Sequence, residues 1–171
     1  YVSRYDWEAS WLLPNLRQER REVPVSTVKE CLEEAFAGES QANRKYLAFA
    51  RKADREGHPQ VARLFRAAAA AETVHAHSHL AAMGGIGGTR ENLEEAIGGE
   101  THEFRSMYPG MIETAERAGD AKALRSFRYA NEVEKIHAAL YQGLLDTIEG
   151  DQEEFPYYVC PVCGHTAERG A

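Results

Sequence analysis

Two copies of the motif Glu-x-x-His constrain this chain more than any other feature. They consist of Glu72 with His75 and Glu134 with His137. Residues three apart share one face of an α-helix, so the two side chains of each copy can reach the same ion. All four fall where the helical pattern calls for apolar residues, and a carboxylate is almost never fully buried unless it is paired or binds a metal. The motif therefore indicates helices that hold metal ions.

A single glutamate precedes each copy on an earlier helix, Glu39 before the first and Glu100 before the second. Each interrupts an otherwise apolar stripe. Four-helix bundles that combine one glutamate from each of two helices with Glu-x-x-His from each of the other two hold a pair of iron or manganese ions. Carboxylate and imidazole donors suit both metals. Glu103, one turn beyond Glu100 on the same stripe, adds a seventh candidate ligand.

Four long helical segments are expected, at residues 26–56, 59–83, 90–118 and 121–150. Thr27 and Glu30 have the spacing of a capping box, and Asp120 is the expected cap of the fourth helix. Pro59 favours the first turn of the second helix. The glycine-rich connection at 84–88 is expected to be flexible and able to bridge a longer distance.

The chain also repeats internally. The region around Phe65 and the first Glu-x-x-His recurs at a constant offset around Phe127 and the second copy, whereas the offset from Glu39 to Glu100 is one position shorter. A helix pair therefore occurs twice, and packing about a pseudo-two-fold axis would bring four helices and their glutamates together. A bundle with satisfied polar residues and no metal is the alternative. Recurrence of the pattern on four helices argues against it.

Length and composition exclude several classes of protein. The chain has 171 residues, enough for one domain with small appendages. Its formal net charge of -7 disfavours a nucleic-acid partner. We expect no membrane association, because no apolar run approaches the roughly 20 residues of a membrane span. No signal peptide is visible, and three cysteines do not make a secreted disulfide scaffold. A cytoplasmic location is the simplest expectation.

Five stretches of this chain resemble the rubrerythrin family. Ferritins and bacterioferritins look similar at most ligand positions but generally lack the extra carboxylate found here at Glu103. The resemblance implies an all-α, ferritin-like four-helix bundle at 26–150, followed at 151–171 by a short rubredoxin-like segment that is incomplete in this chain. The stretches are AFAGESQ (35–41), ETVH (72–75), GETHE (99–103), MYP (107–109) and EKIH (134–137).

The resemblance also implies how two irons would be held. Glu72 and Glu134 would bridge the two ions. Glu39 would be a terminal ligand of the first iron, and Glu100 and His137 would be terminal ligands of the second. These roles follow from the resemblance and not from the spacing of the residues.

Four residues are the implied catalytic set. Glu103 and His75 would exchange at the first iron, with Glu103 bound in the oxidised state and His75 in the reduced state. A tyrosine at each of the positions of Tyr46 and Tyr108 hydrogen-bonds near the metal site in this family. For each tyrosine alone, plain core packing is an equally good explanation.

A second metal motif lies near the end of the chain, where Cys160 and Cys163 are followed by Gly164. It resembles the first half of a rubredoxin knuckle, which holds iron or zinc with four thiolates. This chain supplies two, and Cys31, placed in a helix, is an improbable third. We expect a second pair of cysteines beyond the sequence given. A native half-site and a redox disulfide are the alternatives.

Residues 1–25 form a separate N-terminal arm. It carries Trp7 and Trp11, and tryptophans in a short tail rarely remain in solvent. We expect the arm to dock on a neighbouring subunit or partner, or on its own bundle.

Taken together, the resemblance implies a non-haem di-iron peroxidase that reduces hydrogen peroxide to water in oxidative-stress defence. Its cofactors would be two irons, with one further iron or zinc if the cysteine site is completed. Electrons would come through a rubredoxin-type iron from rubredoxin or an NAD(P)H-dependent reductase, and the protein would be a homodimer or higher homo-oligomer. The alternatives are a ferroxidase that uses O2, a non-enzymatic iron-storage or electron-carrier protein, and a structural zinc-bound adaptor.

Overall fold

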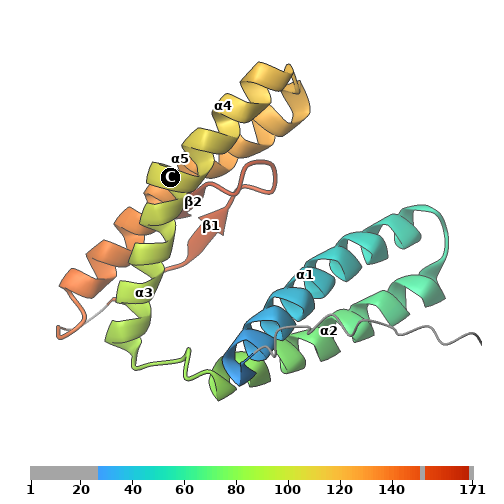
Figure 1. The fold of residues 1–171 in the computed structure, drawn as a ribbon, viewed down its shortest axis with the longest axis horizontal. Helices are drawn as coiled ribbons and strands as arrows, with labels where there is room; N and C mark the ends of the chain where they lie inside the picture. Colours follow the sequence, from blue (N-terminus) through green and yellow to red (C-terminus); the bar gives the residue numbers. More distant parts are fainter. Residues whose placement is uncertain (1–26, 151–152, 170–171) are drawn as a thin grey trace, which may run out of the picture.

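The computed structural model describes residues 27–150 and 153–169. The described residues are mostly helical, with only two short strands among them, which confirms the expected all-α class (Figure 1). The N-terminal arm lies outside the described residues, so its expected docking stays a prediction. In chain order the elements are α1 (Val28–Arg55), α2 (Pro59–Ala82), α3 (Thr89–His102), a π-helical turn η1 (Glu103–Met107), α4 (Tyr108–Ala118), α5 (Ala121–Asp146), β1 (Tyr157–Val159) and β2 (Thr166–Glu168).

The helices begin where their capping residues predict. The backbone N–H of Thr27 donates to Glu30 Oε2 at 2.6 Å, and the N–H of Glu30 donates to Thr27 Oγ1 at 3.2 Å, which completes the capping box. Asp120 Oδ1 accepts hydrogen bonds at 3.0 Å from the backbone of Lys122 and Ala123. These bonds satisfy N–H groups that have no partner within the helix. Among the described helices, none is long and apolar enough to cross a membrane.

The first hairpin consists of α1 and α2, and its helices meet through small side chains. Ala50, Ala53 and Ala62 form its buried centre, with Phe65 packed against them. Because alanine has no bulk beyond Cβ, the two helices can approach closely. The buried core of this hairpin is therefore small, and no side chain larger than alanine is fully buried in it.

The third expected helix, at 90–118, is interrupted just before Pro109, a residue that with Gly98 and Gly99 was expected to disturb it locally. Between α3 and α4 the backbone passes through η1, and Pro109 follows directly in the first turn of α4. A π-helical turn accommodates one extra residue within a helix. It explains why the offset of the repeat is one position longer from Tyr46 to Tyr108 than from Glu39 to Glu100.

The second hairpin, in which α3, η1 and α4 pack on α5, repeats the contacts of the first. Arg66 Nη1 donates to Asp54 Oδ2 at 2.8 Å, and at the equivalent positions of the repeat Arg128 Nη2 donates to Glu116 Oε1 at 2.6 Å. The turns of both hairpins follow the same plan, since Gly57 and Gly119 both have positive φ. The predicted internal repeat is therefore confirmed in three dimensions.

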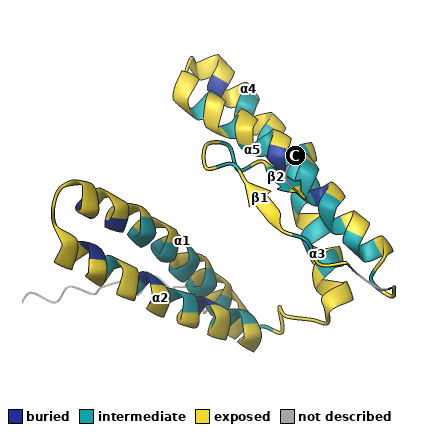
Figure 2. Cartoon of the chain, turned by 180° about the vertical axis from the view of Figure 1, so that it is seen from behind, coloured by how far each residue is buried: buried dark blue, intermediate teal, exposed yellow. Residues whose placement is uncertain are grey.

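The two hairpins lie apart in the single chain. The described residues of α1 and α2 make no contact with those of the second hairpin (Figures 1 and 2). Each hairpin has its own few buried residues, and in the second hairpin Val133 lies beside the C-terminal ribbon (Figure 2). The remaining described residues are half-buried or exposed. All helices expected for a ferritin-like bundle are present. A single chain holds them as two separate hairpins.

The connection between the hairpins is more constrained than its glycines predicted. At the α2 end, Gly84 has φ +70°, and the N–H of Gly85 donates to the carbonyl of Leu80. At the α3 end, the N–H of Gly88 donates to Glu91 Oε2 at 2.6 Å. Both ends are thus hydrogen-bonded to the adjoining helices, so this segment is not free to extend.

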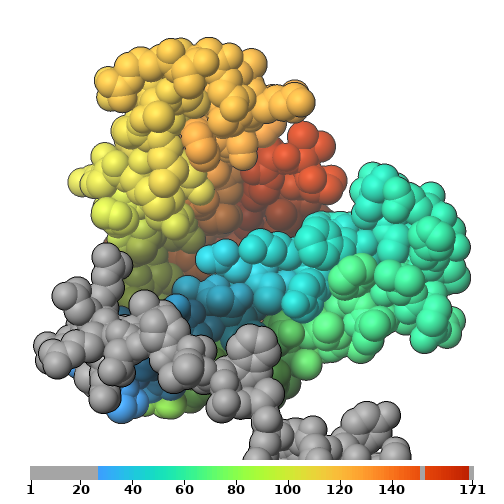
Figure 3. Space-filling view, turned by 45° about the vertical axis from the view of Figure 1, so that its right-hand side comes forward, coloured from blue at the N-terminus to red at the C-terminus, as the bar shows by residue number. Residues whose placement is uncertain are grey.

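The C-terminal residues form a small antiparallel ribbon of β1 and β2, in which Tyr158 pairs with Ala167. The ribbon lies against α5, on the side that faces the first hairpin (Figures 1 and 3). Cys160 and Cys163 occupy the turn between the strands, and the N–H of Gly164 donates to the carbonyl of Cys160. Both cysteines therefore lie on one tight turn, and the rubredoxin-like character of this segment stays a prediction.

Candidate metal centres

The first hairpin brings Glu39, Glu72 and His75 into one cluster. One donor atom from each lies within 4.8 Å of the other two. His75 Nδ1 is 3.0 Å from Glu72 Oε2 and 3.9 Å from Glu39 Oε1. Glu72 and His75 lie one turn apart on α2, and Glu39 reaches them from the antiparallel α1, as the spacing predicted.

The second hairpin repeats this arrangement with Glu100, Glu134 and His137. His137 Nδ1 is 2.9 Å from Glu134 Oε2 and 3.6 Å from Glu100 Oε1. The other ring nitrogen, Nε2, is 2.9 Å from Thr166 Oγ1 in the C-terminal ribbon. The Nδ1 atom therefore faces the carboxylates, while Thr166 contacts the opposite side of the ring.

Carboxylates are crowded in the second cluster. Burial raises the pKa of Glu100 to about 7, and its hydrogen bond with Glu134 and the charges of Glu134 and Glu103 add to the rise. Burial also raises the pKa of Glu103, followed by the charge of Glu134. A cation between these oxygens would remove their mutual repulsion, so the residues present fit a divalent metal.

Glu103 owes its position to the π-helical turn. It is the first residue of η1, and its interaction with Glu134 and His137 places it beside the second cluster. The first hairpin has no such turn in α1, so the extra carboxylate belongs to one half of the repeat. π-Helical turns within α-helices are frequent at functional sites because they redirect a side chain.

The two candidate tyrosines occupy equivalent places in the repeat. The Tyr46 ring lies 6.0 Å from that of Phe65, and the Tyr108 ring lies 6.4 Å from that of Phe127. Tyr108 also lies within the electrostatic influence of the carboxylates. Burial, followed by the charge of Glu103, raises the pKa of its hydroxyl. Both tyrosines thus pack against a phenylalanine in the same way. They differ in that Tyr108 also lies near Glu103.

The seven expected ligands do not converge within one chain. Three lie on the first hairpin and four on the second, and the described parts of these hairpins do not touch. The expected burial is also incomplete, because the His75 side chain is 54% exposed while that of Glu72 is 18% exposed. The physical reason is that both ligand faces lack the second pair of helices that would cover them.

The turn between β1 and β2 carries the two cysteines that were expected to form half of a metal site. Cys160 and Cys163 are free thiols, and backbone hydrogen bonds from Cys163 and Val162 lower the pKa of Cys160. A lowered pKa favours the thiolate, the form that binds metal. Within residues 27–150 and 153–169, no third ligand joins them in a metal-binding cluster, and Cys31 lies elsewhere, exposed on α1.

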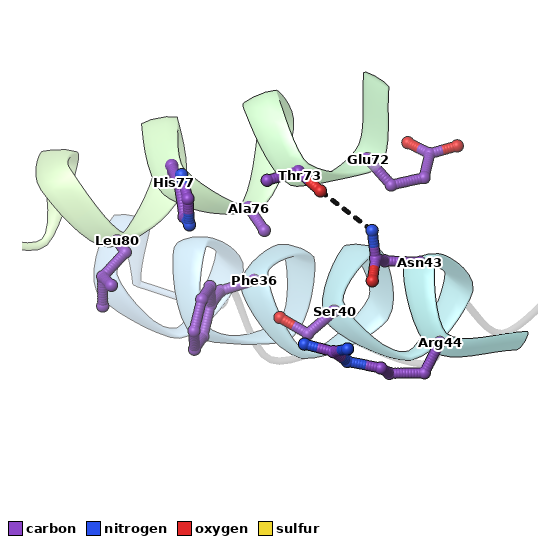
Figure 4. A pocket seen from close by; sticks show the side chains of 9 residues that line it. All are labelled: Phe36, Ser40, Asn43, Arg44, Glu72, Thr73, Ala76, His77 and Leu80. Atoms are coloured by element: carbon purple, nitrogen blue, oxygen red, sulfur yellow. Dashed lines mark hydrogen bonds between the residues drawn. The ribbon is translucent and has the colours of Figure 1, made fainter. Parts of the chain in front are cut away.

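A groove of ≈ 220 Å³ runs between α1 and α2. Its lining includes Ser40 and His77, and Glu72 stands at one end of it (Figure 4). Asn43 Nδ2 donates to Thr73 Oγ1 at 2.8 Å and to the carbonyl of Ala69 at 2.7 Å, which ties the two helices together. Sequence reasoning missed Asn43 and Thr166, since an isolated asparagine or threonine carries no spacing signal.

Comparison with known proteins gives one consistent result. The family model described as rubrerythrin matches residues 30–145. Rubrerythrin-2 of Clostridium acetobutylicum is 37% identical over 160 residues, which cover 84% of this chain and 87% of that protein. Nigerythrin of Nitratidesulfovibrio vulgaris is 34% identical over 155 residues, which cover 82% of this chain and 76% of that protein.

A solved structure of nigerythrin in its fully reduced, all-ferrous state is 31% identical, with a TM-score of 0.48 over 88% of this chain and 81% of that chain. The match to the family model spans both candidate metal clusters. The chain therefore belongs to the rubrerythrin family of ferritin-like di-iron oxidoreductases.

Proposed function

We propose that this protein is a non-haem di-iron peroxidase that reduces hydrogen peroxide to water. The observation that carries the proposal is the duplicated cluster of two glutamates and a histidine, with Glu103 added beside the second copy. Two such clusters provide hard oxygen and imidazole donors for two ions. A structural zinc site would instead favour four tight cysteine and histidine ligands.

The proposed ligands divide between the hairpins. Glu72 and Glu134 are the proposed bridging carboxylates, Glu39 is terminal on one side, and Glu100 and His137 are terminal on the other. When bound, an iron pair would supply two electrons and Lewis acidity toward the O–O bond of peroxide. The remaining contributions come from side chains of the chain itself.

Glu103 and His75 are the proposed exchangeable pair. Burial and the neighbouring Glu134 raise the pKa of Glu103, so its carboxyl is more easily protonated and less firmly held as an anion than an exposed glutamate. His75 has the more exposed side chain of the two Glu-x-x-His histidines, at 54% against 28% for His137. His137 is fixed by Thr166 through Nε2, whereas the described residues offer Nε2 of His75 no hydrogen-bond partner, so His75 is the histidine that can move.

Conversion of hydrogen peroxide to two waters consumes two electrons and two protons. Tyr108 can hold a proton near the site, since its hydroxyl has a raised pKa and stays protonated at neutral pH. We assign it the role of hydrogen-bond donor to peroxide. Tyr46, the equivalent residue of the first hairpin, is the second proposed donor.

Electron supply is assigned to the C-terminal ribbon. Cys160 and Cys163 lie against α5 in a groove that also includes Val133 and Ile136, the latter next to His137 in the chain. Cys160 and Cys163 would supply two of the four thiolates for an iron here, and such an iron would provide one-electron transfer near α5. The ultimate donor in this proposal is rubredoxin or an NAD(P)H-dependent reductase.

The experiment is a comparison of oxidants. The protein is loaded with ferrous iron without oxygen, and the optical change on mixing with peroxide or O2 is followed in a stopped-flow instrument. Peroxide should oxidise the pair much faster than O2. Faster oxidation by O2 would favour a ferroxidase, and binding of zinc alone with no optical change on adding peroxide would exclude redox function. The double variant Glu134→Ala/His137→Ala, which lacks the second cluster, serves as the control.

A further inference from the structure

Each hairpin presents an unpartnered face beside its metal ligands. On the first hairpin, Val61 and Leu64 of α2 are 48% and 68% exposed, and Phe49 of α1 is 47% exposed. The second hairpin exposes Met111, which corresponds to Phe49 in the repeat. Large apolar side chains that are this exposed mark a face that packs against another protein surface.

The ligands carried by the two hairpins indicate which surface packs on these exposed faces. The first hairpin carries three ligands and the second carries the equivalent three plus Glu103. A di-iron bundle needs one hairpin of each kind, with a glutamate from each of two helices and Glu-x-x-His from each of the other two. The chemical complement of each hairpin is therefore the other hairpin of the same sequence.

The length of the connection determines which chain supplies it. A ferritin-like bundle links its helix pairs by one long crossover that returns along the bundle. Since α2 has 24 residues, that crossover must run about 36 Å. Only residues 83–88 connect α2 to α3, and the path from Ala82 to Thr89 spans at most about 25 Å when fully extended. The short connection cannot close the ferritin-like bundle within one chain.

Full extension is moreover prevented by the hydrogen bonds at both ends of the connection. Gly85 is bonded back to α2 and Gly88 forward to α3. The side chain of Asn92 also exchanges two hydrogen bonds with Gly87, at 2.8 and 3.0 Å. The connection therefore leads α3 away from the first hairpin, as Figure 1 shows.

We propose that two copies of this chain exchange hairpins. The α1–α2 hairpin of one copy packs on the α3–α5 hairpin of the other, and each of the two resulting bundles holds one metal pair with ligands from both chains. Two experiments test this proposal. The first measures iron binding and rests on the proposed di-iron function, whereas the second measures the mass of the protein and does not. Exchange also accounts for the near absence of large buried side chains in either hairpin alone.

The first experiment tests complementation. One copy carries Glu72→Ala/His75→Ala and the other carries Glu134→Ala/His137→Ala, with different affinity tags, and tandem purification isolates the mixed dimer. Exchange leaves one bundle with both defects and one intact, so the mixed dimer should bind about half of the wild-type iron. Bundles closed within a chain would leave no intact site, and iron binding would equal the average of the two parent variants.

A matched control places both defects on the same hairpin. A mixed dimer of Glu39→Ala with Glu72→Ala/His75→Ala damages both bundles under exchange and should recover no iron above its parents. Recovery in this control would overturn the proposal, because it would mean that the ligands are not divided as described.

The second experiment needs no metal. Insertion of about 20 glycine and serine residues between Gly87 and Gly88 gives a connection long enough for the crossover, so the dimer should become a monomer of half the mass. The same insertion between Gly57 and His58, in the turn between α1 and α2, should leave the dimer unchanged. A monomeric wild type, or a dimer that survives the first insertion, would contradict exchange. If the insertions change the mass as expected but the protein binds no iron pair, hairpin exchange stands and only the proposed peroxidase function is contradicted.

Discussion

His137 Nε2 and Thr166 Oγ1 lie 2.9 Å apart and join α5 to the C-terminal ribbon. The same threonine hydroxyl is 3.1 Å from the carbonyl of Gly164, next to the cysteine knuckle, and can donate to it. If it does, Thr166 accepts from Nε2–H of His137, and in that neutral tautomer Nδ1 carries the lone pair that a metal ion needs. Nδ1 is the nitrogen that faces Glu134 and Glu100, so this contact would orient His137 for the proposed metal ion.

Replacement of Thr166 tests this contact directly. Thr166→Val removes the acceptor at nearly constant volume, and iron affinity should fall by about tenfold to a hundredfold, as is usual when the partner of a histidine ligand is lost. Thr166→Ser retains the hydroxyl and should bind iron almost as the wild type does. Competition with a chelator of known affinity measures both. Equal affinity in the valine variant would show that the contact does not orient the ring.

Local features of this structure were predictable from sequence because they depend on neighbouring residues. The capping box at Thr27 and Glu30 and the cap at Asp120 are set within one helical turn. The three-residue spacing of Glu72 and His75 fixes their common face in the same way. Antiparallel pairing within each hairpin then follows from the tight turn at Gly57.

Other features could not be predicted because they depend on remote parts of the chain. The apolar stripes predict that ligand faces are covered, but not which chain covers them, and His75 is 54% exposed in the single chain. The π-helical turn was visible only as a change in repeat spacing at Glu100, which has no structural meaning until the backbone is known. Thr166 lies on a ribbon of three-residue strands, too short for a periodic pattern.

The extra carboxylate should be needed for turnover and dispensable for folding. Glu103→Ala removes a carboxylate present in only one half of the repeat, so the helices and both clusters of two glutamates and a histidine remain. We expect peroxide to oxidise the diferrous protein at least about tenfold more slowly, with thermal stability nearly unchanged. Glu95→Ala, at an exposed position of α3, is the matched control. Unchanged peroxide kinetics in the Glu103 variant would remove its exchange role.

The metal-free protein should lose stability as the pH rises through neutrality. The folded protein raises the pKa of Glu100 from 4.5 to about 7, so folding favours the protonated carboxyl. This contribution is fully present below about pH 4.5 and is lost as the pH rises past about 7. The melting temperature of the metal-free protein should therefore decline between about pH 5 and pH 8.

Two substitutions isolate the contribution of Glu100. Glu100→Gln cannot ionise and should flatten this decline, whereas Glu94→Gln, at an exposed position of α3, should leave the slope as in the wild type. Some slope should persist in the Glu100 variant, because burial also raises the pKa of Glu103. An identical slope in Glu100→Gln and wild type would show that Glu100 is not held protonated.

The close approach of α1 and α2 should make the first hairpin intolerant of added volume. Ala62 is fully buried against Ala50 and Ala53, so Ala62→Leu has no space for its new atoms and must push the helices apart. We expect a loss of about 1–3 kcal/mol in the free energy of unfolding, measured by urea titration of the metal-free protein. Ala67→Leu adds the same atoms at an exposed position of α2 and should change stability by less than about 0.5 kcal/mol.

Because the ligand cluster depends on the spacing of these helices, Ala62→Leu should also weaken iron binding. A variant that folds less stably but binds iron as the wild type does would show that the alanine contact sets stability alone.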